Sequence, residues 1–392
     1  MAVTTMWSTT LDNVDAAASE IGALSAQIEE DGDISQPVFD LLKQCGCFRM
    51  LVPRAHGGDG LSIQQALAVI ERVSRADASV GWNVMIGSSN LVVVGAFPQE
   101  TFDRVYQAGP DVMVVGSHAP KGTCTPAPGG YVINGRWPFV SGCRYADWIV
   151  TQGVVTDGDG ARRKGIDGRP DMKLSLLPPD DVGILDTWHT SGLRGTGSHD
   201  VEVKDVYCPE ERNCRWFGGT PSKSGGIFAV PPVAQLGLFM AAVALGTAQA
   251  ALDDVTELAS SGKRPAYGVR RLAESTLFQT DVGETHVKLR AARALLYSEA
   301  EAVWRKATGG GDFTLHDRAQ MRATSSQVSA MCVEATTAAY RHGGGSAIYA
   351  SSSLRRRFQD IQALGQHAGV GREFFTIMGA LLSGEEPEVI RI

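Results

Sequence analysis

The first part of the chain has the hydrophobic spacing of amphipathic helices. Apolar residues recur at three- and four-residue intervals in 16–29, 37–44 and 62–75, which places them on one helical face. Residues 77–94 are apolar and rich in small side chains, as expected for a buried helix. The pattern predicts an N-terminal helical domain over residues 1–110.

A different pattern begins at about residue 111. Short alternating or apolar runs, such as VMVVGS, GYVING and DWIVTQGVV, are separated by Gly, Pro and Asp, which is typical of strands and turns. Residues 157–170 are polar and glycine-rich, which indicates a loop. We expect a middle β domain, a barrel or a sandwich, over residues 111–225.

Helical spacing returns after the β domain. Long periodic segments cover 234–259, 271–307, 315–341 and 354–382 and are separated by glycine-rich stretches. They predict a C-terminal four-helix bundle over residues 226–392. The expected fold class is therefore α+β, with a β domain inserted between two helical domains.

One segment is long and uncharged enough to suggest a transmembrane helix. Residues 224–252 carry no charged side chain. The pair Pro231-Pro232 interrupts the segment, and Gln235, Thr247 and Gln249 lower its hydrophobicity. We expect a helix buried inside the bundle.

Composition narrows the classes of function. The 392 residues are 43% hydrophobic and 20% charged, with a net charge of -7. This balance gives no reason to expect nucleic acid or an anionic membrane as a partner. The seven cysteines form no CxxC pair, and no histidine or cysteine spacing is typical of a metal site. We expect reduced thiols in the cytoplasm and no metal.

The stretch NGRWPFVSGC, residues 134–143, raises a question of chemistry. It places Trp137, Pro138 and Phe139 directly before Ser141, although a central strand rarely accepts proline. One interpretation is an apolar wall against which a flat ligand lies; the other is a buried β corner. No nucleophile motif, P-loop or strand followed by GxGxxG is present. The residues alone support a cofactor pocket between the β domain and the helices, without naming the cofactor.

The order of domains resembles that of the acyl-CoA dehydrogenase superfamily. Five segments match its pattern in order: GSHAPKGT (116–123), GGYVINGRWPFVSGCRYADW (129–148), SGLRGTGSHDVEVKDVYCPEE (191–211), RPAYG (264–268) and RHGGGSAIYASSSLRRRFQD (341–360). The set covers nearly the whole chain. The resemblance implies a flavin bound along the strand that carries Trp137 and Ser141.

Two branches of the superfamily are open. A dehydrogenase needs a carboxylate base to remove a proton α to a thioester carbonyl. The usual position of that base lies in GQHAGVG (365–371), where this chain has His367. WPFVSGC, GLRGTGS and FQDIQALGQHAG are more similar to the oxygenase components of two-component flavin-dependent monooxygenases. An acyl-CoA dehydrogenase-like enzyme with a base elsewhere is the alternative, and a flavin-binding scaffold without turnover is a third class.

The oxygenase branch implies an activity and its partners. Reduced FAD or FMN from a separate reductase would react with O2 to form a C4a-hydroperoxyflavin, which would hydroxylate a phenol- or indole-like substrate. A histidine such as His367 would donate to the peroxide or take the phenol proton. A neighbouring subunit's Gly-Gly loop would approach the adenine end of the cofactor, which implies a homotetramer.

The resemblance also assigns the site residues. The catalytic residues are His367 and Ser141, and Ser141 would hydrogen-bond the N5/O4 edge of the flavin. The expected flavin-binding residues are Trp82, Ser117, Trp137, Phe139, Ser141, Arg264, Gly343 and Gly344. From their positions in the sequence, two helical turns after Trp82 and directly after Ser117, we also expect Asn90 and His118 to bind the substrate.

Five of these residues also have plainer interpretations. His118 fits a solvated loop as well as a substrate-facing position. Asn90 fits a buried amide that bonds only to the backbone, and Arg264 fits a salt bridge of the bundle. Gly343 and Gly344 would equally serve as the end of a helix.

Overall fold

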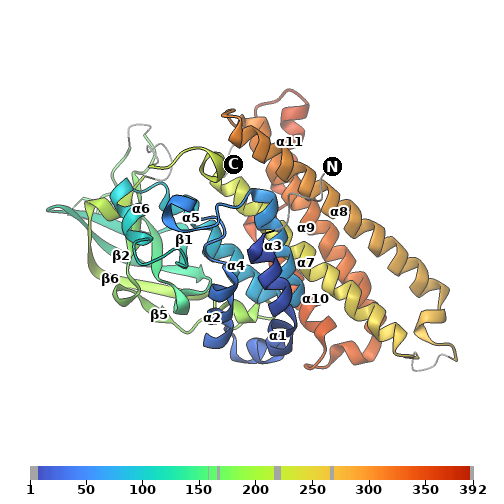
Figure 1. Cartoon of the computed structure of the whole chain (residues 1–392). Coiled ribbons are helices and arrows are strands. Elements are labelled where there is room, and N and C mark those ends of the chain that lie inside the picture. Colours follow the sequence, from blue (N-terminus) through green and yellow to red (C-terminus); the bar gives the residue numbers. More distant parts are fainter. Residues whose placement is uncertain (1–7, 158, 166–167, 216–221, 265–268, 389–392) are drawn as a thin grey trace.

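A computed structural model describes residues 8–157, 159–165, 168–215, 222–264 and 269–388. The chain forms a β domain at one side, a bundle of long helices at the other, and N-terminal helices between them (Figure 1). Of the RPAYG segment, residues 265–268 lie outside the described part.

The described residues of the N-terminal part form six α-helices. They are α1 (Thr9–Asp31), α2 (Gln36–Cys45), α3 (Ile63–Ala76), α4 (Ala78–Ser89), α5 (Leu91–Val94) and α6 (Gln99–Val105). Side chains fix where α3 and α4 begin: the Ser62 hydroxyl accepts from the backbone N–H of Gln65, and the Asp77 carboxylate accepts from that of Val80. Eleven of the twelve residues of α4 are buried, as its apolar sequence predicts.

The β domain contains one mixed sheet. Its strands are β1 (Val114–Ala127), β2 (Gly130–Val140), β3 (Trp148–Val155), β4 (Met172–Leu177), β5 (Gly183–Leu185), β6 (His199–Pro209) and β7 (Asn213–Cys214). They are ordered β5-β6-β2-β1-β3-β4-β7. β1 and β3 run parallel and the other neighbours run antiparallel. In the described residues the hydrogen-bonded order ends at β5 and β7, and the sheet curls so that β6 contacts β4, although the two are not neighbours in that order.

The C-terminal part consists of α7 (Pro232–Ser260), α8 (Thr276–Thr308), α9 (Leu315–Gly343), α10 (Ser353–Gly365) and α11 (Glu373–Leu382). α7 packs on α9, α8 and α10 and also on α3, so it joins the bundle to the N-terminal helices. It is long and apolar enough to cross a membrane, but its most apolar window is 83% buried inside the protein. The prediction of a bundle helix is confirmed.

The expected fold class is confirmed. The strands begin at Val114 and end at Cys214, and long helices resume at Pro232. The described residues of 157–170 form no helix or named strand, and isolated bridges join Thr156 to Arg162 and Lys164 to Pro170.

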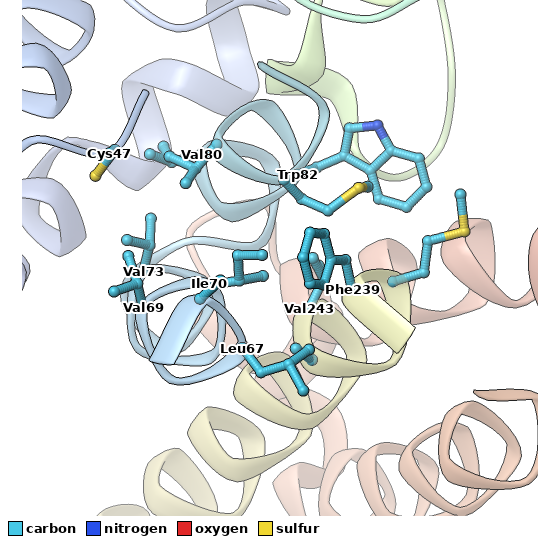
Figure 2. Packing of buried hydrophobic residues seen from close by; sticks show 14 of the residues in the cluster. Cys47, Leu67, Val69, Ile70, Val73, Val80, Trp82, Phe239 and Val243 are labelled. Atoms are coloured by element: carbon cyan, nitrogen blue, oxygen red, sulfur yellow. The ribbon is translucent and has the colours of Figure 1, made fainter. Parts of the chain in front are cut away.

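The helical parts share one hydrophobic core. Trp82 on α4, Phe239 and Val243 on α7, and Leu67 and Ile70 on α3 belong to one cluster of buried side chains (Figure 2). Phe239 and Val243 have no exposed surface, and Trp82 is 5% exposed. This packing fixes α4 against α7 at the side of the molecule that meets the sheet.

Candidate active site

The stretch around Pro138 forms a bulge in β2. Trp137 and Val140 both pair with β6, but Pro138 and Phe139 together oppose a single residue of that strand. Phe139 has a φ of 63°, which is uncommon for a non-glycine residue. A bulge tolerates proline because the ladder is already interrupted there. The bulge explains why this strand accepts Pro138.

The bulge sends the two aromatic side chains in opposite directions. Phe139 is 69% exposed and meets Trp188 edge-on, with 6.1 Å between ring centroids. Trp137 has no exposed surface, and its Nε1 donates to the Gln152 carbonyl at 2.8 Å. The prediction that both rings contact a cofactor is therefore corrected. Trp137 fills the space above Gly122, where a Cβ would lie 2.1 Å from its ring, and only Phe139 presents a free face.

Ser141 lies at the centre of a buried hydrogen-bond chain. Its Oγ accepts from Trp82 Nε1 at 3.0 Å and lies 2.7 Å from Ser198 Oγ. Ser198 Oγ lies 2.6 Å from Thr196 Oγ1, which donates to the Leu193 carbonyl at 2.8 Å. The chain links α4, the end of β2 and the segment that precedes β6.

The turn after Ser141 is packed tightly against α4. Gly142 has a φ of 68°, and a Cβ there would lie 2.4 Å from Met113 Cε and 2.8 Å from Asn83 Oδ1. The Gly142 N–H donates to the Thr196 carbonyl at 2.9 Å, and Asn83 Nδ2 donates to the Gly195 carbonyl at 3.3 Å. These contacts hold the two serine-bearing segments together.

Helix α10 anchors the segment that carries Thr196 and Ser198. The Asp360 carboxylate accepts from the Leu193 N–H at 2.6 Å, while Leu193 adopts a left-handed φ of 51°. Gly192 lies so close to α10 that a Cβ would come within 2.1 Å of the Gln359 carbonyl. Burial, and then the nearby Asp77 carboxylate, raise the pKa of Asp360 to about 7.

His367 faces Trp82 from the bundle. The two rings are 5.5 Å apart between centroids and inclined by 61°. His367 Nδ1 accepts from the Gly369 N–H at 2.8 Å, so the proton of the neutral imidazole must be on Nε2. The residue as a whole is exposed, but protein atoms packed around its ring, and then the Arg322 charge, lower its pKa to about 4. At neutral pH this side chain is a hydrogen-bond donor through Nε2.

Arg322 on α9 brings a positive charge close to His367. It is 2% exposed, donates to the Val233 carbonyl at 2.8 Å, and lies 3.8 Å above the Phe374 ring. Desolvation lowers its pKa to about 10, so it remains a cation at neutral pH. This charge disfavours a second proton on His367.

Asn90 ties α4 to the first strand. Its Nδ2 donates to the Ile86 carbonyl at 3.2 Å and to the Val114 carbonyl at 3.0 Å. Ser117 and His118 follow on β1, both half-buried, where the pairing with β3 becomes irregular. Desolvation lowers the pKa of His118 to about 4. The Asn90 amide nitrogen is satisfied by backbone, which was one of the two interpretations of that residue.

Arg264, Gly343 and Gly344 lie at the other end of the bundle. Near the active site, Met240 Sδ would meet a Cβ built on Gly369 at 2.5 Å. From Met240 to the end of α7 at Ser260, twenty residues advance the helix by about 30 Å. Arg264 is exposed there and donates to the Val269 carbonyl at 3.3 Å. One chain therefore does not bring these three residues to Ser141.

The glycines at that end close α9. The helix ends at Gly343, and Gly344 follows with a φ of 59°. Lys263 Nζ donates to the Gly343 carbonyl at 2.9 Å. A cavity of about 250 Å³ opens beside this turn. Its lining residues are Asp254, Leu258, Gly343, Ser346, Ala347, Ser351, Ser352, Ser353 and Leu354.

We call the region where Trp82, Ser141 and His367 meet the junction. Three of its residues could not be identified from the sequence. Ser198 and Thr196 stand in the quoted GLRGTGS segment, but the order of the chain does not reveal that their hydroxyls meet Ser141. Arg322 lies in an ordinary helical pattern, where an arginine is normally exposed. Only the packing of α9 against α7 and Phe374 identifies it.

The junction suits a planar cofactor with a polar edge. Phe139 offers an exposed aromatic face, and Ser141 and His367 offer hydrogen-bonding atoms a short distance away. A strained backbone at an exposed aromatic residue is typical of a ligand site. The residues present therefore fit a flavin ring.

Comparison with known proteins identifies the family. The family model "Acyl-CoA dehydrogenase, N-terminal domain" matches residues 11–101, and "Acyl-CoA dehydrogenase, C-terminal domain" matches residues 238–372. Indole-3-acetate monooxygenase of Pseudomonas putida is 34% identical, covering 92% of this chain and 90% of that protein. The FADH(2)-dependent resorcinol hydroxylase, oxygenase component, of Rhizobium sp. (strain MTP-10005) is 28% identical, covering 92% of this chain and 91% of that protein.

Solved structures share the fold. XiaF from Streptomyces sp., in complex with FADH2 and glycerol, superposes with a TM-score of 0.88 at 23% identity, covering 98% of this chain and 97% of that one. The HsaA monooxygenase from M. tuberculosis gives a TM-score of 0.87 at 24% identity, covering 98% and 99%. The names of the two sequence relatives, a monooxygenase and the oxygenase component of a hydroxylase, favour the oxygenase branch over the alternative. The chain belongs to the acyl-CoA dehydrogenase family and is a flavin-dependent monooxygenase of that fold.

Proposed function

We propose that this chain is the oxygenase component of a two-component system that hydroxylates an indole- or phenol-like aromatic substrate. The names of the relatives support the substrate class: two indole-3-acetate monooxygenases are 34% and 31% identical, and a resorcinol hydroxylase component is 28% identical. When bound, reduced FAD or FMN would supply the two electrons that the reaction with O2 requires, with one oxygen atom entering the ring and the other leaving as water.

The observation that carries the proposal is the protonation state of His367 together with its hydrogen bond to Gly369. Its Nδ1 is occupied by the Gly369 N–H, and its lowered pKa keeps the ring neutral. The only proton it offers is on Nε2. A neutral donor stabilises an oxygen-centred negative charge without supplying an acidic proton, which suits an oxygenase that must avoid premature release of hydrogen peroxide. Of the two roles expected for this histidine, the structure favours donation over proton abstraction.

The other junction residues would bind and orient the flavin. Phe139 would pack against a face of the isoalloxazine ring. Ser141, held by Trp82, would meet its N5/O4 edge. The apolar packing of Trp82 on α7 would keep water from the reacting atoms.

The substrate would lie beyond the flavin. Ser117 and His118 come from β1 and Asn90 from the end of α4, so these elements would form one wall of the site. The lowered pKa of His118 makes it a neutral group at physiological pH, which is compatible with an uncharged aromatic ring. We assign it and Asn90 as substrate-facing, with Ser117 next to the flavin.

The remaining proposals concern partners. A separate flavin reductase would deliver the reduced flavin, as the words "oxygenase component" in the name of the resorcinol relative suggest. A homotetramer would bring Arg264, Gly343 and Gly344 of a neighbouring subunit to the far end of the cofactor. The exposed side chains of Ile348 and Tyr349, 67% and 66% exposed beside the glycine turn, support a subunit contact there. We place the enzyme in the cytoplasm.

An acyl-CoA dehydrogenase-like activity has less support. Glu373 is the acidic residue that follows His367, but it is exposed at the start of α11. Its carboxylate lies back against Gly371, where a Cβ would come within 2.0 Å of Oε2. Among the described contacts of Trp82, Ser141 and His367, none is made by a carboxylate.

Isotope incorporation tests the proposal. The protein, a flavin reductase, NADH and FMN or FAD are incubated under ¹⁸O₂ with indole-3-acetate, indole or resorcinol, and the products are analysed by mass spectrometry. We expect one labelled oxygen atom in at least one aromatic product, formed only when the chain and the reductase are both present. Absence of any labelled product, together with reduction of oxidised flavin by acyl-CoA thioesters, would establish the alternative.

A further inference from the structure

The hydrogen-bond chain through Ser141 has one direction. At one end Trp82 Nε1 is a donor and has no acceptor capacity; at the other end the Leu193 carbonyl is an acceptor and has no proton. The Thr196 hydroxyl therefore donates its hydrogen to the Leu193 carbonyl, and its oxygen accepts a hydrogen bond from the Ser198 hydroxyl. Ser198 in turn accepts from Ser141, at 2.6 and 2.7 Å along these two links.

Burial keeps water from replacing the bonds that set the direction of this hydrogen-bond chain. Trp82, Ser141, Ser198 and Thr196 are 5%, 5%, 4% and 1% exposed. Bulk water has little access to replace any link, and reversing the chain would remove the bond from Thr196 to Leu193. The Leu193 carbonyl would keep its bond from Trp188 Nε1 at 3.0 Å, so reversal would lose the one hydrogen bond that the Thr196 hydroxyl makes to it.

This direction decides what Ser141 offers a ligand. Its proton is held by Ser198, and one of its two lone pairs is held by Trp82. The remaining position on Oγ is an acceptor. Reduced flavin carries a proton on N5 and is a donor there, whereas N5 of oxidised flavin is a bare acceptor.

We propose that Ser198 and Thr196 are positioning residues that hold Ser141 as a hydrogen-bond acceptor and so make the site select reduced over oxidised flavin. The inference rests on the proposed binding of flavin at Ser141 and extends it to the redox state that is bound. Such selectivity suits an enzyme that receives reduced flavin from a reductase and must release the oxidised form after each turnover.

Breaking the chain at Thr196 tests the proposal. In Thr196→Val, Ser198 loses its acceptor and becomes free to donate to Ser141, which then donates to N5. Dissociation constants for reduced and oxidised FMN and FAD are measured anaerobically by ultrafiltration and flavin fluorescence. We expect the wild type to prefer reduced flavin, and the ratio of the two constants to fall roughly 10-fold in Thr196→Val, the value of about one hydrogen bond.

Three further variants separate this effect from damage to the fold. Ser198→Ala removes the acceptor of Ser141 directly and should lower the ratio in the same direction. Thr196→Ser keeps the hydroxyl and should restore the wild-type ratio. Thr247→Val is the matched control, because this buried threonine on α7 bonds only to the Val243 carbonyl of its own helix; its ratio should not change.

The outcomes distinguish failure of the selectivity mechanism from failure of the proposed function. If the wild type binds flavin and forms product but Thr196→Val and Ser198→Ala both keep the wild-type ratio, the selectivity mechanism is wrong and the proposed function stands. If one of the two variants fails to fold by circular dichroism, the other decides. If the wild type binds neither redox state and forms no product, the proposed function itself fails.

Discussion

The two ends of helix α7 differ in how their polar groups are satisfied. At the end near Met240, the side chains of Trp82, Ser141 and Ser198 bond to one another inside a single chain and are almost fully buried. At the other end Arg264 is exposed, a glycine turn closes α9, and Ile348 and Tyr349 project into solvent.

This difference separates chemistry from assembly. The junction end has a fixed arrangement of donors and acceptors, which is what a reaction on a bound ring requires. The far end has an exposed cation, a glycine turn and exposed apolar side chains, which are features of a surface that meets a partner. One subunit can therefore define the reaction site, whereas the remote part of the cofactor would need a second subunit.

The largest effect is expected at His367. His367→Ala removes the Nε2 donor while leaving Ser141 and Phe139 in place. We expect product formed per reduced flavin consumed to fall by about 100-fold or more, with hydrogen peroxide rising in its place. Product and peroxide are quantified under single-turnover conditions. His286→Ala, an exposed histidine on α8, is the control and should behave as wild type; equal coupling in both variants would remove His367 from the mechanism.

Hybrid oligomers test whether the two ends cooperate between subunits. Ser141→Ala and Arg264→Ala chains are each expected to have weak activity alone. The two chains are co-expressed with different tags and purified as hybrids. A site built from two subunits is then intact wherever the unchanged Ser141 of one chain meets the unchanged Arg264 of the other. We expect activity to recover to a sizeable part of wild type, at most about half of the sites. No recovery above the two parents would place the whole site in one chain.

Asp360 gives a pH-dependent test of the loop that carries the hydroxyls. Its pKa of about 7 in the folded protein exceeds its ordinary value of 3.8, so the folded state binds a proton that the unfolded state has released. The stability that results is fully present below the unfolded pKa and is lost as pH rises through about 7. Asp360→Asn keeps an acceptor for the Leu193 N–H and cannot ionise.

The measurement is urea unfolding of both proteins from about pH 5 to about pH 8. The free energy of unfolding of the wild type should decrease relative to Asp360→Asn across this range. If the wild type instead kept or gained stability relative to Asp360→Asn as pH rises, Asp360 would be ionised in the folded protein throughout this range.

The smallest effect is expected from the ionisation of His367. Its pKa in the folded protein, about 4, is below its ordinary value of 6.5, so the unfolded state takes up the proton first as pH falls. The contribution of neutral His367 to stability is therefore present above 6.5 and is lost progressively as pH falls toward 4. Wild type should lose stability relative to His367→Gln over this window, and ¹H–¹³C NMR titration of the imidazole should give the lowered pKa directly. A midpoint at or above 6.5 would contradict the assigned neutral state.

The elements of this fold could be predicted because local patterns determine them. The long periods of the bundle and the alternating runs of the β domain fall where the helices and strands are found. The uncharged segment 224–252 was predictable as a bundle helix because its prolines and amides are ill suited to a membrane. In each case the information lies within a few turns or strands of sequence.

The site was less predictable, because it depends on a bulge and on contacts between distant segments. Strand alternation would put Trp137 and Phe139 on the same face, but the bulge at Pro138 reverses that relation. The partnership of Ser141 with Ser198 joins residues 57 apart in the chain, and no local pattern encodes it. Arg322 shows the same limit, since its burial follows from helix packing alone.

Rapid mixing tests the central claim most directly. The protein, loaded anaerobically with reduced flavin, is mixed with oxygenated buffer while absorbance is followed. The account predicts a long-lived absorbing species distinct from both reduced and oxidised flavin, whose decay is accelerated by an aromatic substrate and whose lifetime is shortened in His367→Ala. Immediate appearance of oxidised flavin in the wild type, with hydrogen peroxide released in equal amount, would contradict it.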